Sequence, residues 1–389
     1  QEDDAWRKIF PLYPTDDKDG FAVSLMPGEA EKQRSFLKTY GLCVIRVLTD
    51  DECTGTIEAF EDDVNAQQNP STATDQLDLS DSRTWETRNF PGGARGAKFL
   101  MPALTLCRAA FQNRVNDAVY TSFVNIYGHE DLVCSLDCFG FQRGTEDIST
   151  EMGSSRPDWR WKLPIHWHVN PWEHEVKNDG REPVYMGLIT LTDQTHSTGG
   201  HVTVPGSSAH LSTWAATNPN CPTRAGQAKQ PRNTIYVPKD CVMKNYEQKL
   251  MLRRGCLLVW DKRQAHGTFE NKGPDVRLQQ FVRYIPSDSW FQKLDAQSPK
   301  EVYERFDQIR QSVNLSSKKE ESEKEARELA LAHASLYSGR TVSSKGRHDA
   351  DLVAIAPMQQ KIAQAHGDLL AENDGRGWKI FDIEERYRC

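Results

Sequence analysis

The sequence lacks several features that would place the protein in a membrane or outside the cell. No apolar run approaches the roughly 18–20 residues of a membrane-spanning helix, so no membrane partner is expected. The first residues have neither the basic start nor the apolar stretch of a signal peptide. The nine cysteines are scattered and contain no C-x-x-C pair, which is typical of reduced thiols rather than a disulfide framework. We therefore expect a cytoplasmic location.

The chain also lacks an excess of positive charge. It has 48 Lys and Arg against 55 Asp and Glu, a formal net charge of −7, so no global basic field attracts nucleic acid. A hydrophobic content of 38% and a charged content of 26% are ordinary for a soluble enzyme. The 389 residues allow one large domain or two ordinary ones. A small molecule is the expected partner.

The pattern of residues changes twice along the chain. A β-branched run at 40–47 predicts a strand, and the capping box from Thr49 to Glu52 opens a helix to about residue 64. Residues 101–127 have apolar side chains at helical spacing. Short apolar runs between Gly and Pro turns then favour a sandwich or barrel. These predicted strands span residues 132–141, 164–169, 185–191, 200–204, 255–260 and 276–285.

We divide the chain into three parts on this basis. Residues 1–128 form an N-terminal α/β segment that packs on the barrel and supplies a lid loop around residues 83–96. Residues 129–290 form the mainly β core, in which 215–250 is an insertion. Residues 291–389 form a C-terminal helical extension, in which Ser298-Pro299-Lys300-Glu301 is a capping box. The fold class is α+β.

Two histidines one residue apart are the first candidate metal ligands. His166 and His168 lie in the predicted strand at 164–169, where residues i and i+2 share a face. Both side chains can therefore reach one ion, and histidine is the commonest metal ligand type. The same spacing also occurs on ordinary polar strand faces, so the pair needs further ligands to count as a site.

A third histidine and an arginine about a hundred residues later supply such partners. His266 follows the buried strand at 255–260, and Arg277 begins the next strand. The guanidinium group grips a carboxylate through two parallel hydrogen bonds. A metal ligand and an arginine on adjacent strands suit a keto acid that binds the metal at one end and the arginine at the other. Arg283 lies on the same strand face and is the reserve candidate.

Four blocks of this sequence resemble the phytanoyl-CoA dioxygenase (PhyH) family of iron(II)- and 2-oxoglutarate-dependent oxygenases. The resemblance covers roughly residues 38–288 and implies a double-stranded β-helix, a cupin-like jelly-roll barrel. Its blocks are Leu163-Pro164-Ile165-His166-Trp167-His168, residues 187–193 with 198–207, residues 255–267 with Asn271, and residues 277–286. It implies Fe(II) as the cofactor, 2-oxoglutarate and O₂ as cosubstrates, and hydroxylation of a C–H bond in a small organic substrate.

The resemblance also implies roles for single residues. His166 and His266 match the two histidines of the family's metal-binding triad, and Arg277 matches the arginine that binds the distal carboxylate of 2-oxoglutarate. The aspartate of the triad falls on His168. Non-haem iron oxygenases usually use two histidines and one carboxylate, so three neutral imidazoles leave the site one negative charge short.

The histidine at position 168 leaves three interpretations open. It is an engineered replacement of aspartate, a natural three-histidine site, or a site in which a nearby carboxylate, Glu173, compensates. A shift of register would instead make Asn170 the third ligand.

Three alternative functions remain beside the oxoglutarate-dependent one. His166, His168 and Glu173, with His210 further on, also match the spacing of a cupin-type metal dioxygenase. A barrel with impaired catalysis would act as a binding module. A nucleic-acid base oxygenase would share the barrel, although the net charge argues against it.

The remaining side chains near the motifs have more ordinary expectations. Strand alternation predicts that Trp167 and Trp260 face away from the metal. Asn271 is expected either to hold the turn after His266 or to orient its ring. His201 is expected to be an ordinary polar histidine.

Overall fold

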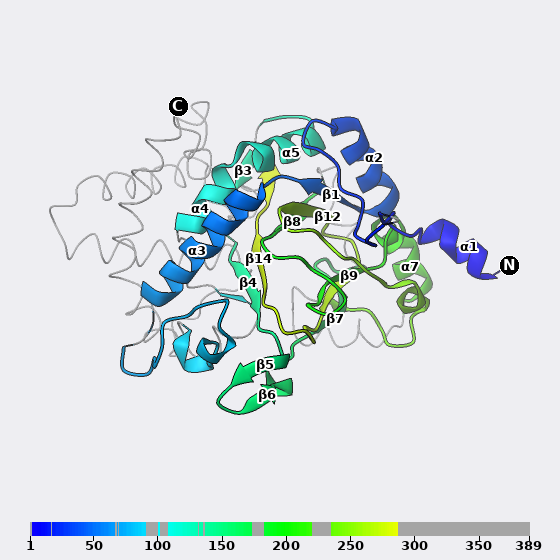
Figure 1. Ribbon diagram of the computed structural model, residues 1–389. Helices are drawn as coiled ribbons and strands as arrows, with labels where there is room; N and C mark the ends of the chain where they lie inside the picture. Colours follow the sequence, from blue (N-terminus) through cyan, green and yellow to red (C-terminus); the bar gives the residue numbers. More distant parts are fainter. Residues whose placement is uncertain are drawn as a thin grey trace, which may run out of the picture.

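A computed structural model provides the structure of the protein (Figure 1). It describes residues 2–286 except residues 17, 67, 69, 91–99, 102–107, 131, 135–136, 173–182 and 220–234. The predicted helical extension at 291–389 lies outside the described residues. The α-helices are α1 Glu2–Ile9, α2 Ala30–Tyr40, α3 Asp50–Ala66, α4 Arg108–Val115, α5 Asp117–Tyr127 and α7 Leu211–Thr217.

The described strands form two main antiparallel sheets and two small ones. The six-stranded sheet has the order β1 Leu42–Arg46, β12 Cys256–Asp261, β8 Tyr185–Thr190, β14 Arg277–Phe281, β4 Phe139–Gln142 and β2 Leu100–Met101. The five-stranded sheet has the order β10 Ile235–Tyr236, β7 Leu163–Trp167, β13 His266–Phe269, β9 Gly200–Thr203 and β11 Gln248–Lys249. The small sheets pair β15 Tyr284–Pro286 with β3 Leu132–Cys134, and β5 Glu146–Thr150 with β6 Gly153–Ser155.

The two main sheets face each other, and their side chains meet between them. The Trp260 ring on β12 lies 5.2 Å from the His266 ring on β13, measured between ring centroids. Arg277 on β14 donates to Thr268 on β13. Interior side chains from the two sheets therefore share one space, and the candidate site lies there.

The alternation of side chains across β1 shows how the six-stranded sheet is covered on both faces. Val44 packs inward with Leu258 and Trp260, whereas Cys43 and Ile45 pack outward in a second apolar cluster. That outer cluster includes side chains of α2, α3, α4 and α5, which lie along this face (Figure 1). The outer face of the five-stranded sheet is covered by α7, where Leu211 clusters with Trp167 of β7 and Val202 of β9.

The predictions for the start of the domain are confirmed. The strand predicted at 40–47 is β1, and the helix predicted from 49 to 64 is α3. Its capping box is present: the Glu52 backbone N–H donates to Thr49 Oγ1 at 3.2 Å, and the Thr49 backbone N–H donates to Glu52 Oε2 at 2.7 Å. These two bonds satisfy backbone donors that the first turn of a helix leaves open.

Three predicted elements are each divided in the structure. The helical pattern predicted at 101–127 is wrong at Met101, which belongs to β2, and residues 102–107 lie outside the described residues. The remainder becomes α4 and α5, because the Asn116 side chain accepts from the backbone of residues 118 and 119 and starts a new helix. The predicted strand at 132–141 becomes β3 and β4, and the one at 276–285 becomes β14 and β15. Apolar periodicity continues across such breaks, so it did not reveal them.

The segment predicted as an insertion supplies strands to the five-stranded sheet. Within 215–250, Ile235–Tyr236 forms β10 beside β7, and Gln248–Lys249 forms β11 beside β9. Both are edge strands of two residues, too short to produce a clear sequence signal. The described part of this segment therefore extends the core.

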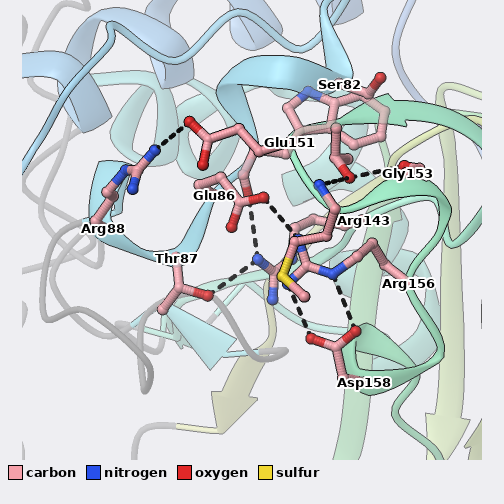
Figure 2. A network of polar contacts seen from close by, with 12 residues as sticks. Ser82, Glu86, Thr87, Arg88, Arg143, Glu151, Gly153, Arg156 and Asp158 are labelled. Atoms are coloured by element: carbon pink, nitrogen blue, oxygen red, sulfur yellow. Dashed lines mark hydrogen bonds and ion pairs between the residues drawn. The ribbon is translucent and has the colours of Figure 1, made fainter.

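The described part of the predicted lid loop is fixed by a network of polar contacts (Figure 2). Arg156 Nη1 lies 2.6 Å from Glu86 Oε1, and Arg156 Nη2 lies 2.9 Å from Asp158 Oδ2. Arg143 is buried and donates to the Trp85 carbonyl at 2.9 Å. Trp85 itself is buried in the outer cluster, so this end of the loop is an anchor. The rest of the predicted lid lies largely outside the described residues.

Among the helices that the structure describes, none is long and apolar enough to cross a membrane.

Candidate metal centre

Two buried histidines face each other across neighbouring strands. His166 on β7 is directly opposite His266 on β13 in the antiparallel register, so the two side chains share a face. Their ring centroids are 4.7 Å apart. Gly267 allows the strands to approach here, because a Cβ at this position would lie 2.3 Å from the Leu163 carbonyl oxygen.

Backbone carbonyls fix the orientation and the tautomer of both imidazole rings. Nδ1 of His166 lies 3.0 Å from the Pro164 carbonyl oxygen, and Nδ1 of His266 lies 2.8 Å from that of Gln264. A carbonyl oxygen only accepts, so each Nδ1 carries the proton and donates it. Each Nε2 is then left with its lone pair, which is the form that binds a metal ion.

His168 completes a group of three histidines. It follows directly after the end of β7, and its Nε2 lies 3.4 Å from that of His166. Ligand atoms of His166, His168 and His266 all lie within 4.8 Å of one another. In the described parts of the chain, no carboxylate belongs to this group. The arrangement offers three imidazole nitrogens to one cation.

The alternative third ligands are placed differently. Glu173, which the cupin-like reading requires, lies outside the described residues. Asn170 Oδ1 accepts a hydrogen bond from the Trp172 backbone N–H at 3.1 Å, and Asn170 is not part of the histidine group. His210 lies against Phe10, with ring centroids 6.2 Å apart, and is also not in the group.

Arg277 is a buried cation on the facing sheet. Its Nη1 donates to the carbonyl oxygen of Phe269 at 3.1 Å, and its Nη2 donates to Thr268 Oγ1 at 3.1 Å. Its side chain makes no ion pair with any acidic residue of the described chain. Burial lowers the pKa of Arg277 to about 9, so the group remains charged at neutral pH. A buried charge without a counter-ion is costly, which favours an anionic ligand here.

A glycine makes room for this guanidinium. Gly199 has φ +77°, and a Cβ there would lie 2.6 Å from Nη1 of Arg277. A residue with a side chain would be both strained in its backbone and in collision with the arginine.

Arg283, the reserve candidate for the carboxylate, already has a partner. Its Nε lies 3.1 Å from Asp137 Oδ2, and Nη1 contacts the Met186 sulfur. It lies between β14 and β15, where the strand predicted at 276–285 is broken. Strand alternation from Arg277 therefore does not extend to it.

The prediction that Trp260 faces away from the metal is wrong. Its ring lies 5.2 Å from that of His266 and 5.0 Å from that of His201. Trp260 belongs to the other sheet, so its position in sequence relative to His266 does not decide the face on which it lies. Trp167 does point outward, with its ring 4.7 Å from that of Trp214.

Sequence reasoning missed the position of His201. Its ring is stacked on that of His266, with centroids 5.6 Å apart and planes 9° apart. The run from Gly200 to Val204 alternates His and Thr with Val, and this alternation was the available signal that His201 faces the polar interior. His201 is not one of the three grouped histidines.

Asn271 holds the turn between β13 and β14. Its Oδ1 accepts from the Gly273 backbone N–H at 2.9 Å, and its Nδ2 donates to the Asp275 carbonyl at 2.7 Å. Of the two roles expected for Asn271, the turn is therefore observed, while the Gln264 carbonyl orients the His266 ring.

Burial of these histidines predicts a pH-dependent stability for the metal-free protein. Burial lowers the pKa of His166 and, together with its histidine neighbours, that of His266; burial and nearby His166 lower the pKa of His201 to about 3. The unfolded chain takes up protons near pH 6.5, whereas these folded groups do not. Stability is thus fully present above about pH 6.5 and is lost as the pH falls toward the folded values.

Each such histidine contributes a loss of up to about 1.4 kcal/mol per pH unit below pH 6.5. Thermal unfolding of the metal-free protein between pH 7.5 and 5 measures this loss. A His201→Leu variant should give a shallower dependence. A melting temperature that does not fall over this range would contradict the expectation.

The fold and the site together define a mixed helical and antiparallel β protein with a candidate metal centre between two sheets. No family model matches the chain. A curated Dictyostelium discoideum protein, "Putative phytanoyl-CoA dioxygenase", is 22% identical over 289 residues, which cover 65% of this chain and 75% of that protein. This similarity confirms the resemblance that the sequence motifs indicate.

The chain is also similar to solved structures. One is EctD from S. alaskensis in its apoform, with 11% identity, a TM-score of 0.42, and coverage of 72% of this chain and 82% of that one. Another is the epimerase SnoN in complex with Fe³⁺, alpha ketoglutarate and nogalamycin RO, with 12% identity, a TM-score of 0.40, and coverage of 67% and 84%. At these TM-scores the likeness carries no conclusion by itself.

Proposed function

We propose that this protein is an Fe(II)- and 2-oxoglutarate-dependent dioxygenase that hydroxylates a C–H bond of a small organic substrate. The observation that carries the proposal is the pairing of two features in one interior. These are three converging imidazoles and a buried arginine that has no acidic partner among the described residues. The similarity to a phytanoyl-CoA dioxygenase supports the same class.

The residues present fit a divalent metal ion. His166 and His266 would hold it through Nε2, because their Nδ1 protons are already donated to carbonyls. His168 would supply the third nitrogen. The lowered pKa values of His166 and His266 help, since neutral rings do not need to lose protons before they bind the ion. Three neutral ligands leave the full positive charge of the ion uncompensated, which favours an anionic cosubstrate.

The residues also fit a dicarboxylate. Arg277 would bind the distal carboxylate, and Thr268, which already accepts from Arg277, holds the guanidinium in place. Two buried nitrogen atoms in the same interior, His201 Nε2 and the N–H-bearing Trp260 Nε1, have no hydrogen-bond partner among the described residues. Buried polar groups are normally satisfied, so an anion that accepts hydrogen bonds suits this space.

In this proposal the protein's side chains bind the metal ion and orient the cosubstrate. When bound, iron with 2-oxoglutarate and O₂ supplies the oxidising chemistry, and the cosubstrate leaves as succinate and CO₂. His166, His168 and His266 fix the ion at one end of the interior, and Arg277 sets the direction of the cosubstrate. Trp260 and the apolar residues beside it exclude water from the space between the sheets.

The same proposal extends to fold and domains. The strands of residues 129–290 in the two facing sheets form a double-stranded β-helix. Residues 1–128 pack on it and add the two edge strands, β1 and β2, of the six-stranded sheet. The order of strands supports this, because β7, β13 and β9 lie together in one sheet while β12, β8 and β14 lie together in the other.

Metal content and cosubstrate turnover test the activity directly. Protein loaded anaerobically with Fe(II) should convert 2-oxoglutarate to succinate when O₂ is admitted. Some uncoupled turnover is expected even without the natural substrate. Protein that takes up no iron and forms no succinate would instead support the non-catalytic binding module.

A His168→Asp variant tests the unusual third ligand. We expect it to bind Fe(II) at least about tenfold more tightly than the chain with His168, because a carboxylate offers a hard cation a negative charge. Anaerobic titration with Fe(II) measures the difference. The same substitution at an exposed histidine, His196→Asp, is the matched control and should change nothing. Equal Fe(II) affinity in all three proteins would show that position 168 does not contact the ion.

A further inference from the structure

His201 lies in the interior, beside the candidate metal centre and opposite the residue that binds Arg277. In the antiparallel pairing of β9 with β13, His201 is directly opposite Thr268, and Thr203 is directly opposite His266. Directly opposed residues share a face, so His201 lies on the same face as His266 and Thr268. Thr268 is the residue that accepts from Arg277. His201 therefore lies beside the path between the histidine group and the arginine.

His201 has an unused polar atom in this position. The residue is 5% exposed, and its Nε2 has no hydrogen-bond partner in the described structure. Its ring is held from two sides, by stacking on His266 and by Trp260 at 5.0 Å. Its own backbone N–H is satisfied separately by Gln194 Oε1. Buried polar atoms normally have a hydrogen-bond partner, so a buried imidazole that packing holds in place and that lacks one can bind a ligand there.

The Nε2 atom of His201 is available to donate a hydrogen bond. It is buried and has no partner among the described residues, so no protein contact there fixes the tautomer. A neutral imidazole carries one N–H, and a carboxylate beside Nε2 selects the tautomer with the proton on that atom. It donates without adding a second positive charge beside Arg277.

We infer that His201 is a positioning residue for the cosubstrate, donating from Nε2 to the carboxylate that Arg277 binds. The inference rests on the proposed function and adds to it a second recognition group for that carboxylate. A leucine here would pack against His266 equally well but would leave the carboxylate to the arginine alone. His201 thus contributes to the choice of a dicarboxylic over a monocarboxylic keto acid.

Two probes separate recognition from packing. Protein loaded with Mn(II) is titrated anaerobically by calorimetry with 2-oxoglutarate and with 2-oxopentanoate, which has the same chain but no distal carboxylate. In His201→Leu, we expect 2-oxoglutarate to bind about tenfold to a hundredfold more weakly, the ratio for one lost hydrogen bond to a charged group. The affinity for 2-oxopentanoate should be unchanged.

Further variants keep the test informative. His201→Gln places an amide N–H near the position of Nε2 and should restore part of the affinity for 2-oxoglutarate. His196→Leu, the same kind of change at an exposed histidine, should resemble the natural chain. Far-ultraviolet circular dichroism and thermal unfolding check that each variant is folded.

The outcomes distinguish the inference from the proposed function. If the natural protein binds both keto acids equally, the proposed role of Arg277 fails and this inference fails with it. If the natural protein prefers 2-oxoglutarate but His201→Leu weakens both probes equally, or neither, then His201 only packs and the inference is overturned while the function stands.

Discussion

A His266→Ala variant is expected to lose metal binding by more than about a hundredfold and to lose cosubstrate turnover with it. His266 is buried, its tautomer is fixed by the Gln264 carbonyl, and its ring lies within 5.0 Å of both other histidines. Loss of an outer partner of a metal ligand already costs about 10–100-fold, so loss of a ligand should cost more. Metal analysis after dialysis, together with a succinate assay, measures both effects.

The matched control for this variant is His210→Ala. His210 packs against Phe10 outside the histidine group, so its loss should leave both metal content and turnover intact. If His266→Ala retained a full equivalent of iron, the centre would have to be elsewhere, and the proposed function would lose its main support.

The second large effect is expected at Arg277. An Arg277→Leu variant should bind 2-oxoglutarate roughly 150- to 5,000-fold more weakly, because truncating one partner of a buried charge pair costs about 3–5 kcal/mol. The apparent KM for 2-oxoglutarate should rise correspondingly, while the metal affinity should change little because Arg277 is not among the grouped ligands. Steady-state kinetics and anaerobic titration give the two quantities separately.

Arg283→Leu provides the control within the same segment. Arg283 is engaged with Asp137, so its replacement should leave the affinity for 2-oxoglutarate unchanged even if it lowers stability. A large loss of cosubstrate affinity in Arg283→Leu, with none in Arg277→Leu, would reverse the assignment of the two arginines.

Much of the local structure could be predicted because it depends on residues close in sequence. The capping box from Thr49 to Glu52 marks the start of α3 within one turn. Val44 and its neighbours in β1 alternate between two apolar clusters, as a strand covered on both faces must. The breaks at Asn116 and between β14 and β15 were harder, because apolar spacing continues through them.

The candidate site was only partly predictable for a different reason. His166, His266 and Arg277 stood out because a metal ligand and an arginine in that order match a known motif. Trp260 and His201 did not, since neither has a local signal for a role. Trp260 faces His266 because their two sheets pack against each other. The alternation of side chains along one strand does not show how that strand's sheet packs on another sheet.

The sequence by itself determined the class of chemistry, through the types and order of a few residues. The sequence predicts a metal ion and a carboxylate-bearing ligand from four residues alone: His166, His168, His266 and Arg277. Only the tertiary structure decided that the three rings converge and that Arg277 is buried, with no acidic partner in the described part of the chain. It also decided that His201 lies on the same face as His266 and Thr268. The physical reason is that convergence depends on strand register and sheet packing, which join residues a hundred positions apart.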